Sequence, residues 1–211
     1  MSLFIAFEGP EGAGKTTQVD HLVQRLAAAG VHAERTREPG GTPLGRELRR
    51  LLVSPEGPAL SPREEALLLA LDRLRHVESV IRPALARGAV VVTDRYVDST
   101  LAHQGHGGGA PLETLRWLID YATGGLLPDL TVLLDVDVEL GIERRREAYR
   151  TGLGEFNRID GRDLAYHRRV RQGYLLLAQQ APKRYLVIDA ALPEDQVTDR
   201  IWERVAPLTN K

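Results

Sequence analysis

The stretch Gly9-Pro10-Glu11-Gly12-Ala13-Gly14-Lys15-Thr16 follows the pattern G-x-x-x-x-G-K-[ST], which is typical of a phosphate-binding loop. Its glycines allow backbone N–H groups to turn inward around a polyphosphate. Lys15 adds a positive charge for the outer phosphates, and the hydroxyl of Thr16 is suited to holding Mg²⁺. A chain of this length matches the pattern by chance on the order of once in a hundred. The alternative interpretation is a glycine-rich turn with an idle lysine.

The residues on either side of the loop predict the strand and the helix that such a loop needs. Before it, the apolar run from Leu3 to Phe7 is typical of a buried parallel strand. After it, apolar residues recur at helical spacing from Val19 to Leu26, and Gly30 is expected to end that helix. Strand, loop and helix in this order favour a phosphate site over an idle turn.

The composition limits the other classes of function. A chain of 211 residues predicts one α/β domain over residues 1–211. A formal net charge of -1 gives no reason to expect nucleic acid or a membrane as a partner, and the absence of cysteine excludes disulfides and thiolate chemistry. No apolar run reaches transmembrane length and the first residues lack a basic signal region, so we expect a cytoplasmic protein. Only three of the 28 basic residues are lysines, Lys15 among them, and the rest are arginines. Because arginine is so common in this chain, a single arginine is weak support for a function.

The rest of the chain alternates between predicted strands and predicted helices. Strands are expected at residues 32–37, 89–93, 130–134 and 184–188. Helices are expected at residues 44–52, 62–81, 112–122, in a stretch ending near 180, and at 197–205, with Ser61 as an N-cap and a disturbance near Pro83. The glycine-rich residues 105–109 are expected to form a mobile loop. This alternation predicts an α/β fold, a five-stranded parallel sheet with helices on both faces, as in P-loop NTP hydrolases and kinases.

Charged residues follow several of the predicted strands, and ligands of such sheets bind beyond the carboxyl ends of the strands. Arg37 and Arg95 are therefore expected to converge beside the loop, where their forks would match a second phosphorylated ligand. The alternative for each arginine is a salt bridge at the surface. Asp94 is either a helix N-cap or a carboxylate near the magnesium, and its place after a buried strand favours the metal. Asp135 and Asp137 are given a structural role.

An arginine-rich segment at about residues 143–162 is interpreted as a lid. Gly152 and Gly154 lie within it, and its positive charge suits closure over a transferring phosphoryl group. The alternative is a solvated helix face. The pattern does not decide which of its arginines acts, and the candidates are Arg144, Arg145, Arg146, Arg150 and Arg158.

Four motifs resemble those of the thymidylate kinase family, bacterial type, and the similarity covers nearly the whole chain. They are Phe7-Glu8-Gly9-Pro10-Glu11-Gly12-Ala13-Gly14-Lys15-Thr16-Thr17, Thr36-Arg37-Glu38-Pro39-Gly40-Gly41-Thr42-Pro43-Leu44-Gly45, Asp94-Arg95-Tyr96-Val97-Asp98-Ser99 and Ala102-His103-Gln104-Gly105. The first motif is generic for P-loop proteins, whereas the second and third are specific. The resemblance implies phosphoryl transfer from ATP to dTMP with Mg²⁺ as cofactor. Homodimers are usual in the family, so a homodimer is expected.

The resemblance also implies roles for individual residues. ATP would be bound by the loop and one lid arginine: Gly9, Pro10, Glu11, Gly12, Ala13, Gly14, Lys15, Thr16, Thr17 and Arg144. The metal would be held by Thr16 and Asp94. The dTMP site would comprise Glu11 near the deoxyribose, Arg37 and Arg95 at the phosphate, and Leu69, Arg73, Ser99, His103 and Gln104 at the base. Catalysis is assigned to Lys15, Asp94, Arg95, Arg146 and Arg150, because a glycine at position 12 is typical of members whose lid supplies the catalytic arginine.

The chain departs from the family pattern at a few positions. Leu69 stands where a phenylalanine usually stacks on the thymine, so the base would meet an apolar face without aromatic stacking. His103 stands where a tyrosine is usual. The lid reads Asn157-Arg158-Ile159-Asp160 in place of a common Asp-Arg-x-Glu.

Two rival functions use the same loop. The first is another kinase, acting on a different nucleoside monophosphate or on a deoxynucleoside. A deoxynucleoside kinase would need a general-base carboxylate for a sugar hydroxyl. The convergent arginines instead favour an acceptor that already carries phosphate. The second rival is a non-catalytic nucleotide switch. A GTPase of that kind would carry Asn-Lys-x-Asp and a strand-end Asp-x-x-Gly, and neither occurs in the sequence.

Overall fold

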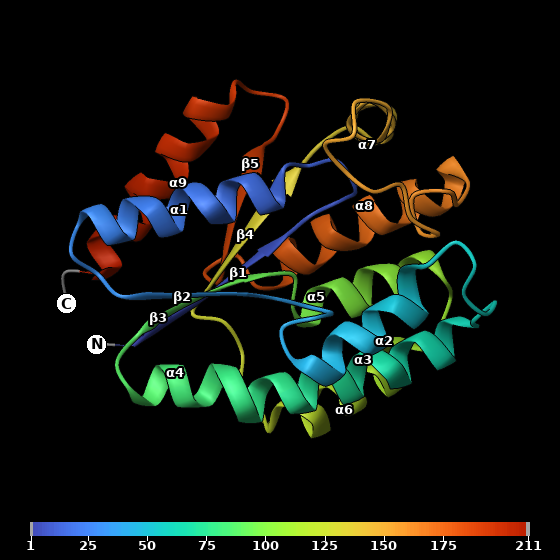
Figure 1. The fold of residues 1–211 in the computed structure, drawn as a ribbon, viewed down its shortest axis with the longest axis horizontal. Coiled ribbons are helices and arrows are strands. Elements are labelled where there is room, and N and C mark those ends of the chain that lie inside the picture. Colours follow the sequence, from blue (N-terminus) through green and yellow to red (C-terminus); the bar gives the residue numbers. More distant parts are fainter. Residues whose placement is uncertain (1, 210–211) are drawn as a thin grey trace.

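The computed structural model describes residues 2–209 and contains a five-stranded parallel sheet in the order β2-β3-β1-β4-β5 (Figure 1). The strands are β1 (Leu3–Glu8), β2 (Ala33–Arg37), β3 (Val90–Asp94), β4 (Leu130–Asp135) and β5 (Tyr185–Asp189). The central strand β1 pairs with β3 and β4, and every one of its residues is buried. Burial on both faces explains why its sequence is a nearly continuous apolar run. The predicted sheet is confirmed.

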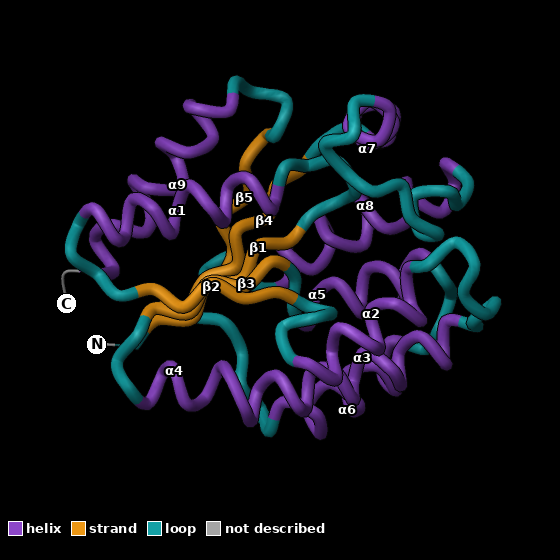
Figure 2. The backbone as a smooth tube through the Cα atoms, viewed as in Figure 1, coloured by secondary structure: helices purple, strands orange, loops and turns teal. Residues whose placement is uncertain are grey.

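Helices cover both faces of this sheet (Figures 1 and 2). They are α1 (Lys15–Ala28), α2 (Pro43–Val53), α3 (Pro62–His76), α4 (Arg82–Ala86), α5 (Val97–Thr100), α6 (Leu112–Thr123), α7 (Val138–Arg150), α8 (Leu164–Gln180) and α9 (Glu194–Thr209), with two π-helical turns, η1 (Val77–Ile81) and η2 (Leu101–Gly107). On one face α1 and α9 pack against the sheet in a core that includes Leu22, Ile201 and Ile5. On the other face η1, α6 and α8 pack around Phe4. None of the described helices is long and apolar enough to cross a membrane.

The carboxyl ends of the three adjacent strands β2, β3 and β1 meet at one edge of the sheet. Arg37 is in register with Asp94, and Asp94 is in register with Phe7. The chain leaves β1 through Gly9, whose φ of 146° and whose closeness to the carbonyl of Leu134 leave no room for a Cβ. The phosphate-binding loop therefore begins beside the two strand ends that carry charged side chains.

The long helical run after residue 61 begins as predicted, and it is disturbed near Pro83 as expected, by the π-helical turn η1 that directly precedes α4. Ser61 accepts from the backbone N–H of Glu64 and the Glu64 carboxylate accepts from the Ser61 N–H, which completes a capping box. The run then widens through η1 before it continues as α4. Pro83 follows directly after η1 and has no N–H to donate within this continuous run, so the widened turn lies where a proline disturbs a helix.

The prediction of a mobile loop at residues 105–109 is wrong for most of that stretch. Residues up to 107 belong to η2, which packs against α8 and α6. A Cβ at Gly105 would run into Leu112, and a Cβ at Gly107 would run into Tyr166 and Val170. These glycines allow helices to approach closely. The sequence alone does not show whether a glycine-rich stretch serves close packing or mobility.

Candidate active site

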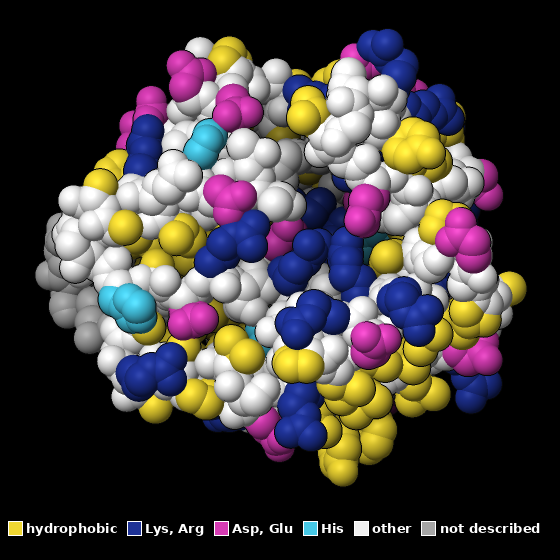
Figure 3. Space-filling model, in the orientation of Figure 1, with side chains coloured by type: hydrophobic (Ala, Val, Ile, Leu, Met, Phe, Trp, Pro, Cys, Tyr) yellow, Lys and Arg dark blue, Asp and Glu magenta, His cyan; other side chains and the backbone are white. Residues whose placement is uncertain are grey.

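A cleft of about 920 Å³ lies at the carboxyl edge of the sheet. It is bounded by the phosphate-binding loop, the ends of β2 and β3, the helix α3, the turn η2 and part of the segment 143–162. Figure 3 shows lysine and arginine side chains gathered in and around this hollow. A concave site lined by cations at the switch point of a parallel sheet is suited to anionic ligands.

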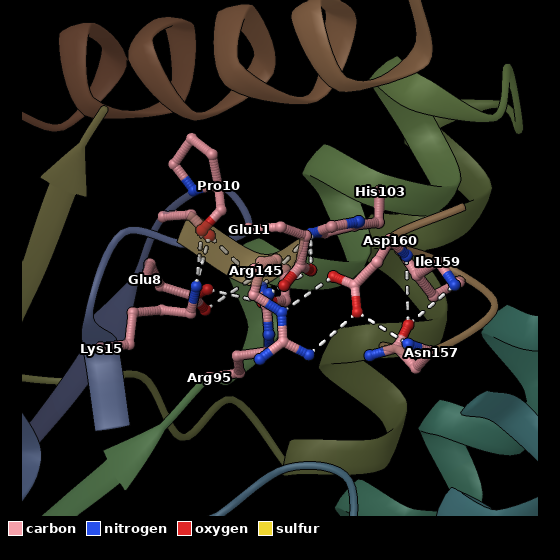
Figure 4. Close-up of polar contacts among 12 residues, drawn as sticks. Glu8, Pro10, Glu11, Lys15, Arg95, His103, Arg145, Asn157, Ile159 and Asp160 are labelled. Carbon is pink, nitrogen blue, oxygen red and sulfur yellow. Dashed lines mark hydrogen bonds and ion pairs between the residues drawn. The ribbon is translucent and has the colours of Figure 1, made fainter. Parts of the chain in front are cut away.

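Lys15 lies at the first position of α1 and is buried against the loop. Its Nζ donates to the carbonyl oxygens of Gly9 (2.9 Å) and Pro10 (2.7 Å), as Figure 4 shows. Burial, followed by the positive charge of Arg95, lowers the pKa of Lys15 to about 8. A negatively charged ligand in the loop would favour the protonated amine and so raise the pKa of Lys15 again.

Thr16 and Asp94 form an all-oxygen pair at the edge of the loop. The Thr16 hydroxyl donates to Asp94 Oδ2 at 2.6 Å. The described residues contain no group of three or more acidic, histidine or cysteine side chains that would enclose an ion by itself. One hydroxyl and one carboxylate fit a magnesium ion that is carried mainly by the phosphates of a nucleotide.

Arg95 is the centre of the polar contacts in the cleft. Its φ of 71° makes it the one non-glycine residue with a left-handed backbone between residues 2 and 209, and such strain is concentrated at functional sites. Its Nη2 donates to Glu11 Oε1 at 2.5 Å, and its Nη1 donates to the hydroxyls of Ser99 (3.1 Å) and Tyr174 (3.0 Å). Burial alone would raise the pKa of Glu11, but Arg95 and Lys15 hold it well below its usual range.

His103 is a neutral member of this cluster. Burial, followed by the charge of Arg95, holds the pKa of His103 well below its usual range. Arg95 Nη1 shares its two hydrogens among Ser99, Tyr174 and His103, whose Nε2 lies at 3.2 Å; because an arginine can only donate, Nε2 is the accepting nitrogen and Nδ1 is left to donate to the hydroxyl of Tyr166 at 3.1 Å. The histidine thus ties Arg95 to α8.

Glu8, which the sequence analysis did not select, supports the loop after β3. Its carboxylate accepts from the backbone N–H groups of Tyr96 (2.8 Å) and Ser99 (3.1 Å), and from the hydroxyls of Ser99 (2.6 Å) and Tyr174 (3.2 Å). Burial, followed by the charge of Asp98, raises the pKa of Glu8. A charged residue at the end of an otherwise apolar strand was the signal in the sequence that could have pointed to it.

Two further arginines stand at the β2 side of the cleft. Arg37 lines it as predicted, and its Nε is buried without a hydrogen-bond partner among the described residues. Arg49, which was not selected, lines the cleft beside it, and burial followed by the charge of Arg37 lowers the pKa of Arg49. Two neighbouring arginines, one of which has an unpaired buried N–H, favour an anionic ligand at the β2 side of the cleft.

The residues predicted to recognise a base surround the inner end of the cleft: Leu69, Arg73, Ser99, His103 and Gln104 all line it. Arg73 is only 1% exposed and already donates from all three nitrogens, Nε to Glu38 (2.8 Å), Nη1 to Thr100 (3.1 Å) and Nη2 to the carbonyl of Tyr96 (2.9 Å). The structure therefore gives Arg73 a bracing role under the cleft, with only its remaining N–H groups left for a ligand.

The segment 143–162 contains the end of α7 and an irregular stretch before α8. The four arginines of α7 in this segment separate into two sets. Arg144 and Arg145 line the cleft, whereas Arg146 lines a second hollow of about 500 Å³ and the exposed Arg150 pairs with Glu147 at 2.6 Å. The structure does not bring the last two into the cleft with the loop.

Arg145 reaches the cleft from α7 and is held at its other side by a buried carboxylate (Figure 4). Its Nε and Nη2 donate to the two oxygens of Asp160 at 3.1 and 2.9 Å. Asp160 also accepts from the N–H of Asn157 at 2.8 Å, which shapes the turn after α7. Against the effect of burial, the hydrogen bond and the charge of Asp160 raise the pKa of Arg145, and the negative charge of Glu11 adds to them.

The two aspartates assigned a structural role have structural contacts. Asp135 is bound by both ends of the Arg171 fork, at 2.7 and 2.9 Å. Asp137 is the N-cap of α7 and accepts from the N–H of Glu139 at 3.1 Å. Both contacts hold α7 and α8 at the end of β4.

Comparisons with known proteins agree with this arrangement. The family model described as thymidylate kinase matches residues 7–201. A protein named thymidylate kinase from Thermomicrobium roseum is 53% identical over 211 residues, covering 100% of this chain and 98% of its own. A second with that name, from Deinococcus radiodurans, is 50% identical over 204 residues (97% and 96% covered), and a third, from Desulfovibrio desulfuricans, is 49% identical over 198 residues (92% and 91%). This chain belongs to the thymidylate kinase family.

Proposed function

We propose that this protein transfers the γ-phosphoryl group of ATP to dTMP, giving dTDP and ADP. The observation that carries the proposal is that a phosphate-binding loop and a second set of cations, Arg37 and Arg95, face one cleft. Membership of the thymidylate kinase family supports dTMP as the acceptor. Phosphoryl transfer rests mainly on positioning and charge stabilisation, and the cleft supplies groups for both.

The donor half of the proposal is the loop and the start of α1. The backbone of residues 9–17 and Lys15 would hold the triphosphate, and Arg144 would hold ATP from the side of α7. Thr16 and Asp94 would hold Mg²⁺, which when bound neutralises charge that develops between the phosphates. The amine of Lys15 already lies against the loop carbonyls, so it would only have to turn from these carbonyls to the phosphates.

The acceptor half is the opposite side of the cleft. Arg95 and Arg37 would grip the phosphate of dTMP, with Glu11 beside the deoxyribose. At the base end, Leu69 would supply an apolar face, and Arg73, Ser99, His103 and Gln104 would supply polar contacts. Residues 143–162 would act as a lid that brings Arg145 to the transferring group, in place of Arg146 and Arg150, to which the resemblance assigned catalysis. ATP and nucleoside monophosphates are cytoplasmic pools, so the proposal places the reaction in the cytoplasm.

The experiment that tests the proposal is a substrate panel. The protein is incubated with MgATP and each of dTMP, dUMP, dCMP, dAMP and dGMP, and the diphosphate products are separated by chromatography. We expect dTMP to be the best acceptor. We expect dUMP to be poorer but active, because the 5-methyl group adds only apolar contact, and dCMP to be at least about tenfold poorer, because its amino group would face buried donors. Failure to phosphorylate any monophosphate, or equal use of dCMP and dTMP, would contradict the assignment.

The pKa of Lys15 predicts that ATP affinity falls at alkaline pH. The amine is charged below a pKa of about 8 and loses its proton above it, whereas a bound polyphosphate favours the charged form. The affinity for ATP should therefore fall by about tenfold between about pH 7 and about pH 9. Near about pH 9, the binding of ATP should be accompanied by the uptake of a proton by Lys15. Isothermal titration in buffers of different ionisation enthalpy measures both effects. The control, Lys15→Arg, keeps its charge over this range and should show a flatter profile.

A homodimer is part of the proposal, and the face formed by α3 and α6 is its candidate interface. These two helices lie side by side, and Figure 3 shows hydrophobic side chains gathered over them. Leu67 is 60% exposed, and the stacked rings of Trp117 and Tyr121 are 65% and 71% exposed. Isolated apolar residues are common at surfaces, but a joined patch on two helices is typical of an interface. Light scattering should give a dimer for the unaltered chain and a monomer for Trp117→Glu, and a monomeric unaltered chain would remove this part of the proposal.

A further inference from the structure

Glu65 is a buried carboxylate that joins two parts of the cleft. It lies on α3, is 1% exposed and lines the cleft. Its Oε2 accepts from Gln104 Nε2 at 2.9 Å. Its Oε1 accepts from Arg158 Nη2 at 3.1 Å and from Arg162 Nη2 at 2.5 Å. One side chain therefore connects a residue of η2 at the base end of the cleft to two arginines that follow α7.

These contacts decide which way the amide of Gln104 faces. A glutamine amide has a donating end and an accepting end, and a carboxylate paired with two guanidinium groups offers acceptors only. The NH₂ group of Gln104 must therefore face Glu65. The carbonyl oxygen, Oε1, is left buried and has no partner among the described residues. A buried acceptor without a partner is unfavourable, so a ligand in the cleft is the natural source of its missing hydrogen bond.

We propose that Glu65 is a positioning residue for base selection, an inference that rests on the proposed function. Glu65 holds Gln104 with its carbonyl oxygen available to the nucleobase, so the site favours a base whose N3 atom carries a hydrogen. Thymine and uracil carry that hydrogen. Cytosine presents a lone pair at N3, which would face the lone pairs of the Gln104 oxygen. Arg158 and Arg162 occupy the other carboxylate oxygen, so the stretch between α7 and α8 secures the same orientation.

Glu65→Gln tests this directly. Glutamine at position 65 both donates and accepts, so the Gln104 amide is released to turn either end toward the base. We expect the ratio of kcat/KM for dTMP to that for dCMP to fall about tenfold. The loss should come from a higher KM for dTMP and a lower KM for dCMP, with kcat changed less. The matched control is Glu78→Gln, the same chemical change at an exposed position on η1, and it should leave the ratio unchanged.

A second variant separates positioning from folding. Gln104→Leu removes the acceptor itself and should lower the same ratio, and the double variant with Glu65→Gln should lose no more than Gln104→Leu alone, because Glu65 acts through Gln104. A ratio of two kcat/KM values does not depend on the folded fraction, so a destabilised variant still gives a result. If Glu65→Gln yields no folded protein, Gln104→Leu decides, and an unchanged ratio there overturns the proposal.

Two other results would overturn it. If Glu65→Gln lowers the melting temperature but keeps the preference for dTMP, or if the two losses add in the double variant, Glu65 has a structural role only. If the unaltered protein does not phosphorylate dTMP, the proposed function itself fails and this inference fails with it. The unaltered protein therefore distinguishes the two kinds of failure before any variant is made.

Discussion

Lys15→Ala is expected to lower kcat by about a thousandfold while the protein remains folded. Loss of a single preorganised charge at a transferring group typically costs about 10²–10³ in rate, and Lys15 is the cation that lies on the loop itself. The fold should tolerate the change. The lowered pKa of Lys15 means that its charge is less favourable in the folded protein than in water, so its removal takes away an unfavourable contribution together with two hydrogen bonds to carbonyls.

The measurement is steady-state turnover with MgATP and dTMP, together with a thermal melt. The melting temperature should stay within about 4 °C of the unaltered protein. Lys183→Ala is the matched control, because it removes a lysine from an exposed turn before β5 and should leave turnover unchanged. Near-normal turnover of Lys15→Ala would show that the loop does not hold the reacting phosphates, and the kinase proposal would have to be given up.

Local signals account for what the sequence predicted well. The glycine spacing of the loop, the apolar run before it and the helical spacing after it are short-range patterns, and the structure has the strand, loop and helix in those places. The convergence of Arg37 and Arg95 followed from a rule of topology, because strands of a parallel sheet end on the same edge. These predictions needed no knowledge of how distant side chains pack.

Predictions that depended on helix phase or on burial were less successful. A run of arginines does not say which of them faces inward, because that depends on where α7 begins and how it is rotated against the sheet. Glu65 reads as an ordinary charged residue in the sequence, and Glu8 stands out there only as the charged end of an apolar run. The packing around them shows that each accepts several hydrogen bonds in the interior. The prediction for the glycines of η2 was wrong for the same reason, because glycine is common both in closely packed helices and in mobile loops.

Arg145→Ala is expected to lower kcat by about a hundredfold or more while changing the affinities for ATP and dTMP by only a few-fold. An arginine that stabilises a transferring phosphoryl group is worth about 10³–10⁵ in rate in the strongest cases. Arg145 is the arginine of α7 that both lines the cleft and is aimed by a bidentate contact, through Asp160 at 3.1 and 2.9 Å. A cation placed for the transition state should affect turnover more than binding of either substrate.

Arg150→Ala is the matched control on the same helix. Arg150 is exposed and pairs with Glu147 one turn earlier, so its removal should change kcat by less than about twofold, as expected of a surface ion pair. Both variants, and Arg146→Ala, are compared by single-turnover kinetics with saturating nucleotides, which separate the chemical step from binding and release. A larger loss in Arg146→Ala or Arg150→Ala than in Arg145→Ala would mean that the segment rotates on closing and presents the other side of α7 to the cleft. Equal and small losses in all three would mean that the charge of the transferring group is carried by Lys15 and Arg95 without help from the lid.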